Sequence, residues 1–426
     1  MAEKIYKKRI VDRLLAERLE EVGAVLIEGP KWCGKTTTAL QQANSKVMLA
    51  NPDELMQSRS MIATNASYLL KGNVPRLFDE WQTIPELWDY IRYEVDKRDE
   101  EGQFILTGSA VPLASDKIVH TGTGRFAWLT MRPMSLWESE ESSGDVSLQS
   151  IFDGNLYIEG ENRHSLEDIV FMLCRGGWPS SLGRSPRAAL RVASDYYDAV
   201  VKADFVRVDT TLRNENRSRM LLRSLARLQG TQTSIAVIRQ DMLSNDENTL
   251  AENTVASYIE ALRRIFIVED MPAWSTNLRS KTVIRTTPTR YFVDPSIAVA
   301  AMGVSPKDLM NDLNTFGFLF EAMAVRDLRV YADALDAKVY HYRDKDELEC
   351  DVVMELRNGR YGLIEIKLGG QENVALAAKQ LSRLSSKIDT NRVGEPAFRM
   401  VLVAVGNRAY LREDGTLVVP IGCLKP

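Results

Sequence analysis

The chain has 426 residues, which is long enough for two or three domains that each bury a hydrophobic core. Hydrophobic residues make up 45% and charged residues 26%, as in soluble globular proteins, and a formal net charge of −4 excludes a chain that is basic throughout. Four scattered cysteines and three histidines argue against a disulfide framework, a zinc site and a histidine-rich metal centre, and no apolar run is long enough to span a membrane. These features predict a cytoplasmic protein with no membrane partner.

The first predicted elements surround a glycine-bounded loop. Residues 4–22 form a charged amphipathic stretch that predicts a helix, residues 24–28 predict a short buried strand, and residues 37–43 open a helix. Between strand and helix, residues 29–36 read Gly-Pro-Lys-Trp-Cys-Gly-Lys-Thr, which fits the pattern G-x-x-x-x-G-K-[ST]. Backbone N–H groups in such a loop converge on phosphate oxygens, so the chain is predicted to bind a nucleoside triphosphate, ATP, with Mg²⁺.

Two residues of this loop have specific expected roles. Lys35 would reach the β- and γ-phosphates, and the hydroxyl of Thr36 would hold Mg²⁺. A glycine turn with a stray lysine is the alternative, and the flanking strand and helix argue against it. The residues expected to contact the nucleotide are Gly29, Pro30, Lys31, Trp32, Cys33, Gly34, Lys35, Thr36 and Thr37.

A second signature follows one strand and one helix later. A strand at 47–50 and a helix at 54–70 lead to residues 74–80, an apolar strand that ends in Asp79 and Glu80. Asp79 would orient Mg²⁺ through water, and Glu80 would polarise the attacking water. The alternative is a strand that simply ends in a charged turn. The spacing from the phosphate loop nevertheless suits a parallel sheet with right-handed crossovers.

The next two strands supply further candidates. Residues 104–109 predict a buried strand, at whose end Thr107 or Ser109 could touch the γ-phosphate or the attacking water. The alternative is a strand that leaves into a glycine turn. Arg125 precedes the strand predicted at 126–131 and is a candidate γ-phosphate arginine, in cis or toward a neighbouring subunit, or else an ordinary surface arginine. The role toward a neighbour leaves a homo-oligomer open.

Five separated motifs now occur in order along the chain: GPKWCGKT, LFDEWQ, FILTGSA, GRFAWLTMRPMSLWE and GGWP. In this order they resemble the prokaryotic AAA+ ATPases that carry a C-terminal domain of unknown function, over nearly the whole chain. The resemblance implies an α/β fold with the parallel sheet of a P-loop NTPase of AAA+ type. It also implies ATP hydrolysis with Mg²⁺, and it makes residues 132–138 the exit from the ATPase domain. The roles it implies are Lys35 on phosphate, Thr36 and Asp79 on Mg²⁺, Glu80 as the hydrolytic base, and Thr107 or Ser109 as γ-phosphate sensor.

The middle of the chain predicts a mainly helical region. Residues 138–153 are rich in Ser, Glu, Asp and Gly and predict a surface loop or linker, which places a first domain at 1–150. In the turn that follows, Trp178 is expected to plug a core. A long helix is predicted at 188–208, and the second domain would span 151–290.

Within that second domain the order of elements is that of a winged helix. Helices are predicted at 220–228, 234–243 and 253–265, followed by an extended segment at 265–271 and a strand at 291–293. Residues 175–290 contain 18 Lys and Arg against 12 Asp and Glu, a net charge of +6. Wing residues Arg279, Lys281 and Arg285 would contact phosphates of DNA, whereas the third helix carries few basic residues. A packing module beside the nucleotide site is the alternative.

The third predicted domain, 291–426, carries a second set of acids. Its predicted elements are a helix at 316–331, strands at 339–343 and 349–356, an Asn-Gly hairpin, a strand at 361–368, a helix at 373–388 and a strand at 400–405. Glu321 lies on the first helix, Asp351 on the second strand, and Glu365 and Lys367 on one face of the third strand.

This order of acids is that of a restriction-endonuclease-like (PD-(D/E)xK) core, which the C-terminal domain of the resembling family also looks like. Asp351 and Glu365, with Glu321, could hold Mg²⁺, and Lys367 would position or deprotonate a water. Alternating exposed charges on an ordinary half-buried strand are the alternative.

Two functions follow from these predictions. The first is an ATP-hydrolysing AAA+ protein whose nuclease-like C-terminal domain acts on or grips nucleic acid, DNA or RNA. The second is a nucleotide-switched regulatory or interaction protein in which the nuclease-like domain is vestigial.

Overall fold

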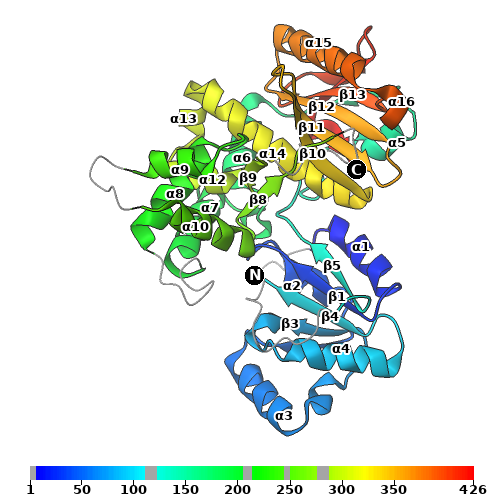
Figure 1. Ribbon diagram of the computed structural model, residues 1–426, viewed down its shortest axis with the longest axis vertical. Coiled ribbons are helices and arrows are strands. Elements are labelled where there is room, and N and C mark those ends of the chain that lie inside the picture. Colours follow the sequence, from blue (N-terminus) through cyan, green and yellow to red (C-terminus); the bar gives the residue numbers. More distant parts are fainter. Residues whose placement is uncertain (1–5, 111–121, 205–213, 244–249, 276–286) are drawn as a thin grey trace. The chain divides into compact units, whose positions relative to one another are not determined.

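The computed structural model describes residues 6–110, 122–204, 214–243, 250–275 and 287–426 (Figure 1). The chain divides into two compact units, one formed mainly by Met1–Pro133 and one mainly by the residues from Met134 onward. The predicted boundary after residue 150 therefore falls inside the second unit. In the part of the chain that the structure describes, no helix is both long and apolar enough to cross a membrane.

The first unit is built on a five-stranded parallel sheet, as predicted. Its strands are β1 (Ala24–Glu28), β2 (Ser45–Met48), β3 (Arg76–Asp79), β4 (Phe104–Gly108) and β5 (Phe126–Thr130), in the order β2-β3-β4-β1-β5. Because all five run the same way, their carboxyl ends lie along one edge of the sheet, where ligands of open α/β sheets bind.

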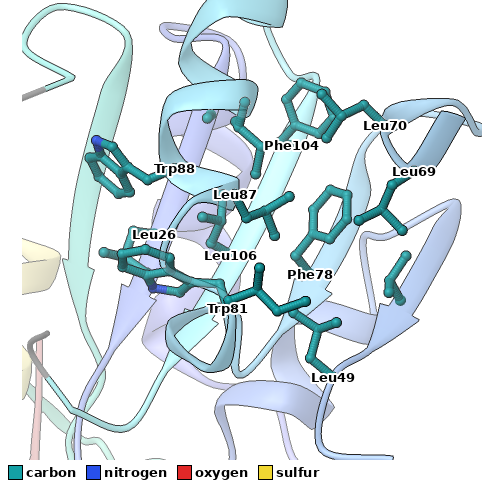
Figure 2. Packing of buried hydrophobic residues seen from close by; sticks show 14 of the residues in the cluster. Leu26, Leu49, Leu69, Leu70, Phe78, Trp81, Leu87, Trp88, Phe104 and Leu106 are labelled. Carbon is teal, nitrogen blue, oxygen red and sulfur yellow. The ribbon is translucent and has the colours of Figure 1, made fainter. Parts of the chain in front are cut away.

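Helices cover both faces of this sheet, which explains why its strands are apolar on both sides. They are α1 (Ile10–Leu19), α2 (Lys35–Leu40), α3 (Pro52–Leu70), the short η1 (Trp81–Thr83) and α4 (Leu87–Arg98). Alternate strand residues pack against different helices. Leu26, Phe78 and Leu106 contact the side chains of α3 and α4 (Figure 2), and Val25 and Ile105 pack with α1 and α2 on the opposite face.

The second unit contains a seven-stranded mixed sheet. Its strands are β10 (Ala337–Arg343), β11 (Glu349–Leu356), β12 (Tyr361–Lys367), β13 (Phe398–Val403), β15 (Thr416–Pro420), β14 (Arg408–Leu411) and β7 (Gly160–Glu161), given in sheet order. β10, β11 and β12 are antiparallel, whereas β13 runs parallel to β12. Helices α14 (Leu313–Ala334) and α15 (Gln371–Lys387) pack on the sheet, and α16 (Thr390–Val393) and η4 (Ile421–Cys423) are short.

The middle of the chain is helical, as predicted. Its helices are α5 (Leu148–Phe152), α6 (Leu166–Arg175), η2 (Pro179–Ser181), α7 (Pro186–Ala199), η3 (Val200–Asp204), α8 (Glu215–Arg227), α9 (Ile235–Met242), α10 (Glu252–Arg264), α12 (Pro295–Met302) and α13 (Pro306–Asn311). Strands β8 (Val268–Met271) and β9 (Thr289–Phe292) form an antiparallel hairpin. Trp178 is fully buried with its ring 4.2 Å from that of Tyr196, so it does plug a core. Arg279, Lys281 and Arg285 lie outside the described residues.

The prediction of a surface linker at 138–153 is wrong. Glu138, Ser139 and Ser142 are buried, and the segment contains α5 and a strand, β6 (Val146–Ser147), that pairs with β16 (Leu424–Lys425) near the end of the chain. The polar composition of the segment led to the wrong prediction, because these polar side chains are buried and have hydrogen-bond partners. The Ser142 hydroxyl, for example, donates to the carbonyl of Leu424 at 2.6 Å.

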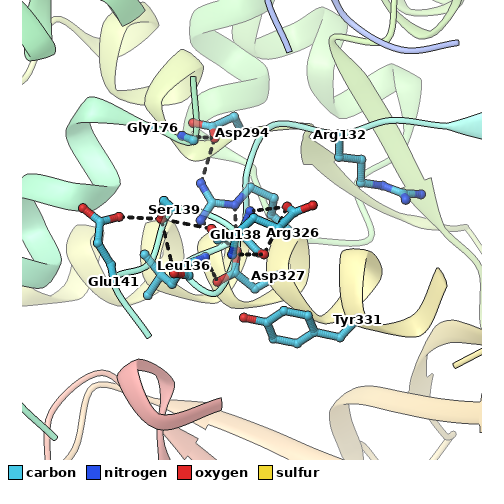
Figure 3. A network of polar contacts seen from close by, with 12 residues as sticks. Arg132, Leu136, Glu138, Ser139, Glu141, Gly176, Asp294, Arg326, Asp327 and Tyr331 are labelled. Atoms are coloured by element: carbon cyan, nitrogen blue, oxygen red, sulfur yellow. Dashed lines mark hydrogen bonds and ion pairs between the residues drawn. The ribbon is translucent and has the colours of Figure 1, made fainter. Parts of the chain in front are cut away.

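A buried ionic network holds the start of this segment (Figure 3). Arg326 lies between Asp294, at 2.8 Å, and Asp327, at 2.7 Å, and the backbone N–H of Leu136 donates to Asp327 at 3.0 Å. Burial raises the pKa of Asp327 to about 6 although Arg326 opposes the shift. The segment that follows the parallel sheet is therefore fixed into the core of the second unit.

Candidate functional site

The phosphate loop has backbone conformations that its glycines make accessible. Gly34 has φ 109° directly before α2, and Gly29 has φ 151°. A Cβ at Gly29 would lie 2.1 Å from the carbonyl oxygen of Met131, so only glycine lets the loop pack against the end of β5. The guanidinium of Arg9 donates to the carbonyl of Cys33 at 2.8 Å, and this hydrogen bond helps to fix the loop.

The Lys35 ammonium lies inside this loop. Its side chain is buried, and Nζ donates to the carbonyl oxygens of Gly29 at 2.9 Å and of Pro30 at 2.8 Å. Lys31, Trp32 and Thr37 occupy the exposed part of the loop and the first turn of α2. An ammonium held only by carbonyl dipoles can exchange them for phosphate oxygens, which carry full charge.

Two hydroxyls converge on the carboxylate of Asp79. The Thr36 hydroxyl donates to Oδ1 of Asp79 at 2.6 Å, and the Thr107 hydroxyl donates to the same oxygen at 2.7 Å. Thr107 is opposite Asp79 in the β3–β4 register. The structure thus joins three of the predicted residues, which come from the start of α2 and from the ends of β3 and β4.

Glu80 lies at the same edge of the sheet. Its backbone has φ 56°, which is uncommon for a residue other than glycine, and its N–H donates to the Thr107 hydroxyl at 3.2 Å. The Ser109 hydroxyl donates to Oε2 of Glu80 at 2.8 Å. Thr107 or Ser109 was expected to touch the γ-phosphate or the attacking water, and in the structure Ser109 contacts Glu80.

Gln82 is a site residue that we did not predict. Its side-chain NH₂ group donates to Oε2 of Glu80 and lies 3.4 Å from the Ser109 hydroxyl. The signal available in the sequence was its position two residues after Glu80, within LFDEWQ.

The position of Arg125 contradicts its predicted role in cis. Arg125 directly precedes β5, which runs parallel to β1, so it lies at the edge of the sheet opposite the phosphate loop. A five-residue strand separates the two edges by about 16 Å, at about 3.3 Å per residue. Its guanidinium pairs with Asp96 at that opposite edge.

The donor set at the phosphate loop fits Mg²⁺. A threonine hydroxyl and a carboxylate are hard oxygen ligands, and the pair formed by Thr36 and Asp79 is already in contact. Both side chains lie where the end of β3 approaches the start of α2. We call Lys35, Thr36, Asp79, Glu80, Gln82, Thr107 and Ser109 the nucleotide site.

The predicted acids of the C-terminal part also lie together in the second unit. We call Glu321, Asp351, Glu365, Lys367 and Tyr291 the carboxylate cluster. The Lys367 ammonium is 2.7 Å from Oε2 of Glu365 and 3.3 Å from Oδ2 of Asp351. The side chain of Glu365 is almost completely buried, that of Glu321 is half-buried, and that of Lys367 is 34% exposed.

Burial and mutual repulsion shift the pKa values in this cluster. Burial first, and then the charge of Asp351, raises the pKa of Glu321 to about 8 and that of Glu365 to about 8. Burial disfavours the charge of Lys367, but Asp351 and Glu365 outweigh this effect and raise its pKa. At neutral pH the two glutamates are therefore mainly protonated.

Tyr291 is the part of the cluster that we did not predict, because nothing in its local sequence distinguishes it from a core residue. It is buried on β9, and its hydroxyl donates to Oε1 of Glu321 at 2.7 Å. Gly230, with φ 74°, lies close by, since a Cβ there would be 3.0 Å from Oε1 of Glu321. The helical middle therefore contributes to a cluster whose acids are on α14, β11 and β12.

The carboxylate cluster does not fit Mg²⁺ as the predicted ligands now lie. Among the described residues there is no group of three or more His, Cys, Asp and Glu side chains that could hold a metal ion. The Lys367 ammonium pairs with two of the three acids, and Tyr291 bonds the third.

Three regions of the chain match known domain families. Residues 22–140 match an AAA domain, residues 166–308 match a domain of unknown function (DUF8612), and residues 316–424 match a second domain of unknown function (DUF4143). Uncharacterized proteins of Mycobacterium bovis and Mycobacterium tuberculosis are each 23% identical to this chain, over 98% of it and 84% of their own length.

Solved structures share only a distant likeness with the chain. A Walker-type ATPase of Pyrococcus abyssi is 16% identical, with a TM-score of 0.42 over 70% of this chain and 97% of its own. The ORC1 protein of Aeropyrum pernix, solved in complex with DNA, is 13% identical, with a TM-score of 0.25 over 71% and 94%. These scores are too low to support an argument. The domain match and the parallel sheet together show that this chain carries an AAA-type ATPase-like domain, followed by two regions of the kind known only as domains of unknown function.

Proposed function

We propose that the nucleotide site binds ATP with Mg²⁺ and hydrolyses it. The observation that carries this proposal is the convergence of the Thr36 and Thr107 hydroxyls on Asp79, beside a buried Lys35. The start of α2 and the ends of β3 and β4 supply these groups, all at the edge where open α/β sheets bind ligands. The match of residues 22–140 to an AAA domain supports the same function.

Each residue has a step in this reaction. Lys35 exchanges the carbonyls of Gly29 and Pro30 for oxygens of the β- and γ-phosphates. Thr36 and Asp79 would hold Mg²⁺, whose charge stabilises the negative phosphates. Glu80 takes a proton from water as the water oxygen bonds to the γ-phosphorus. The bond to the β–γ bridging oxygen breaks, and ADP and inorganic phosphate leave.

ATP turnover by the purified chain tests this proposal. We expect Mg²⁺-dependent release of phosphate, lost in Lys35→Ala and in Glu80→Gln, while Glu80→Gln still binds ATP in calorimetry. Lys71→Ala, on an exposed lysine outside the site, serves as the matched control. Unchanged turnover in both site variants would overturn the assignment.

Arg125 keeps one of its predicted roles. If the protein forms a homo-oligomer, Arg125 is a candidate γ-phosphate arginine for the nucleotide site of a neighbouring protomer.

For the C-terminal part we infer a restriction-endonuclease-like core. Support comes from the order of its elements, which is helix α14, strands β10, β11 and β12, helix α15 and strand β13. Glu321, Asp351, Glu365 and Lys367 occur on these elements in the predicted order and lie together. We propose that this core grips nucleic acid, DNA or RNA, and that ATP turnover gates it.

One observation favours the second candidate function, a nucleotide-switched regulatory protein that does not cut. Lys367 pairs with Asp351 and Glu365, and the described residues of the cluster offer no three-ligand metal site. A nuclease assay on DNA and on RNA, with Mg²⁺ and with or without ATP, separates the two. Cleavage that disappears in Asp351→Ala, but not in the exposed control Asp389→Ala, supports cutting. Binding without cleavage supports the regulatory function.

The proposed nucleic-acid contact in the helical middle has a separate test. The net charge of +6 over residues 175–290 predicts affinity for DNA that falls with salt. Charge reversal at Arg279 and Arg285 should weaken binding and reduce its salt dependence. Unchanged affinity would reject the winged-helix contact and leave this region a packing module.

A further inference from the structure

We propose that Gln82 is a positioning residue, which holds the Glu80 carboxylate so that one defined oxygen faces the attacking water. The inference rests on the proposed ATP hydrolysis at the nucleotide site. Its basis is the unequal surroundings of the two Glu80 oxygens. Oε2 accepts hydrogen bonds from Gln82 and from the Ser109 hydroxyl, whereas Oε1 accepts none from any residue that the structure describes.

The unequal hydrogen bonding of the two Glu80 oxygens identifies which of them acts as the base. An oxygen that already accepts two hydrogen bonds has little capacity left for the proton of water, while Oε1 keeps its lone pairs. Ser109 and Gln82 also lie within 3.4 Å of each other, so both donors act on the same side of the carboxylate. Oε1 is therefore the atom that takes the proton.

The chain around Gln82 is fixed in place. Residues Trp81–Thr83 form η1, Trp81 is buried with its ring 5.1 Å from that of Trp88, and the Thr83 hydroxyl donates to the carbonyl of Glu80 at 2.9 Å. The backbone is therefore fixed on both sides of Gln82, and its carboxamide is held by the contacts with Glu80 and Ser109.

Stability alone does not explain a glutamine at this position. Its Oε1 atom is buried and has no hydrogen-bond partner within the described residues, which is unfavourable. Gly108 makes room for it, because a Cβ there would lie 3.2 Å from that oxygen. The hydrogen bonds that the carboxamide does make are those of its NH₂ group, and these go to Glu80 and Ser109.

The test compares turnover with ATP affinity in the full chain. Gln82→Met keeps the length of the side chain and removes the donor, and Gln82→Ala is the second variant. We expect kcat to fall about 10-fold or more, a part of the 10²–10⁴-fold that a positioned general base supplies, while the Kd for ATP changes less than about twofold. Ser109→Ala should lower kcat in the same way, and Ser109→Thr, which keeps the hydroxyl, should retain more activity. Gln57→Ala, on an exposed glutamine of α3, is the matched control.

The possible results are distinguishable. Wild-type kcat in a folded Gln82→Met or Gln82→Ala protein overturns the inference, and so does an equal loss of kcat and ATP affinity, which indicates a structural role. Turnover that survives in Glu80→Gln rejects the proposed hydrolysis itself. Loss in Glu80→Gln together with normal turnover in the Gln82 variants rejects only the role of Gln82.

Discussion

The nucleotide site and the carboxylate cluster both gather acidic side chains, but they compensate the negative charge differently. In the nucleotide site, Asp79 accepts hydrogen bonds from two neutral threonine hydroxyls. In the carboxylate cluster, three acids interact electrostatically and a single ammonium, that of Lys367, pairs with two of them. The first arrangement can accept a cation without leaving any charge unpaired. In the second, a cation would have to displace the ammonium.

The two sites therefore differ in what holds their acids, which is hydroxyl donors at Asp79 and protons at Glu321 and Glu365. The Thr36 hydroxyl and the Asp79 carboxylate are hard oxygen groups of the kind that bind Mg²⁺. Burial and repulsion instead raise the pKa values of Glu321 and Glu365 to about 8, so that both carry protons at neutral pH. The sequence predicted Mg²⁺ at both sets of acids. The contact between Thr36 and Asp79 fits it, whereas in the second set Lys367 occupies two of the three acids.

The largest expected effect is on the chemistry of the nucleotide site. Glu80→Gln should lower kcat for ATP by about 10²–10⁴-fold, because it removes the group that takes the proton from water. Steady-state phosphate release measures the effect, with Glu101→Gln on an exposed loop as the control. A loss below tenfold would mean that Glu80 is not the base.

The next prediction concerns the protons of the carboxylate cluster. The pKa of Glu321 is near 4.5 when the chain is unfolded and about 8 when it is folded, so between these values the folded state binds a proton that the unfolded state lacks. Stability of the second unit should therefore fall as the pH rises from 5 to 8, by about 1.4 kcal/mol for each pH unit that one such group titrates.

Glu321→Gln should flatten this pH profile, because glutamine cannot ionise. Urea unfolding at several pH values, followed by tryptophan fluorescence, measures it. The exposed Glu413→Gln serves as control, since its carboxylate is outside the cluster. An equally steep profile in Glu321→Gln would show that the cluster does not hold these protons.

The sequence predicted well those site residues whose position depends on spacing along the chain. It predicted less well the features that depend on contacts between distant residues. The phosphate loop and Asp79 were predictable because the loop follows one strand and Asp79 ends another, and parallel strands bring their ends together. The role of Arg125 in cis was wrong because Arg125 precedes its strand, and in a parallel sheet that places it at the edge opposite the loop that follows β1. The burial of the segment at 138–153 was not predicted, because the composition of a segment does not show its hydrogen bonds to distant residues such as Leu424.

The third prediction compares ligands at the two sites. ATP with Mg²⁺, at 100 times its Kd, should stabilise the first unit by about 2.7 kcal/mol, since it binds only the folded state. Lys35→Ala should abolish the effect and Lys71→Ala should not. Mg²⁺ alone should leave the second unit unchanged, because its described residues offer no three-ligand site. Calorimetric melting measures the effect of ATP with Mg²⁺, the loss of this effect in the variants, and the effect of Mg²⁺ alone. Stabilisation of the second unit by Mg²⁺ would contradict the proposed difference between the two sites.

The smallest expected effect tests the hydrogen bond between Tyr291 and Glu321. Tyr291→Phe removes one donor and little volume, so its cost depends on the charge of the acceptor. At pH 6 Glu321 is protonated and the loss should be about 0.5–1.5 kcal/mol, whereas at pH 9 the acceptor is charged and the loss should be about 1.5–3 kcal/mol. Tyr340→Phe is the matched control, since no described residue bonds its hydroxyl, and it should cost little at either pH. Equal losses at the two pH values would mean that Glu321 keeps one charge state across this range, and the distinction between the two sites would then rest on Lys367 alone.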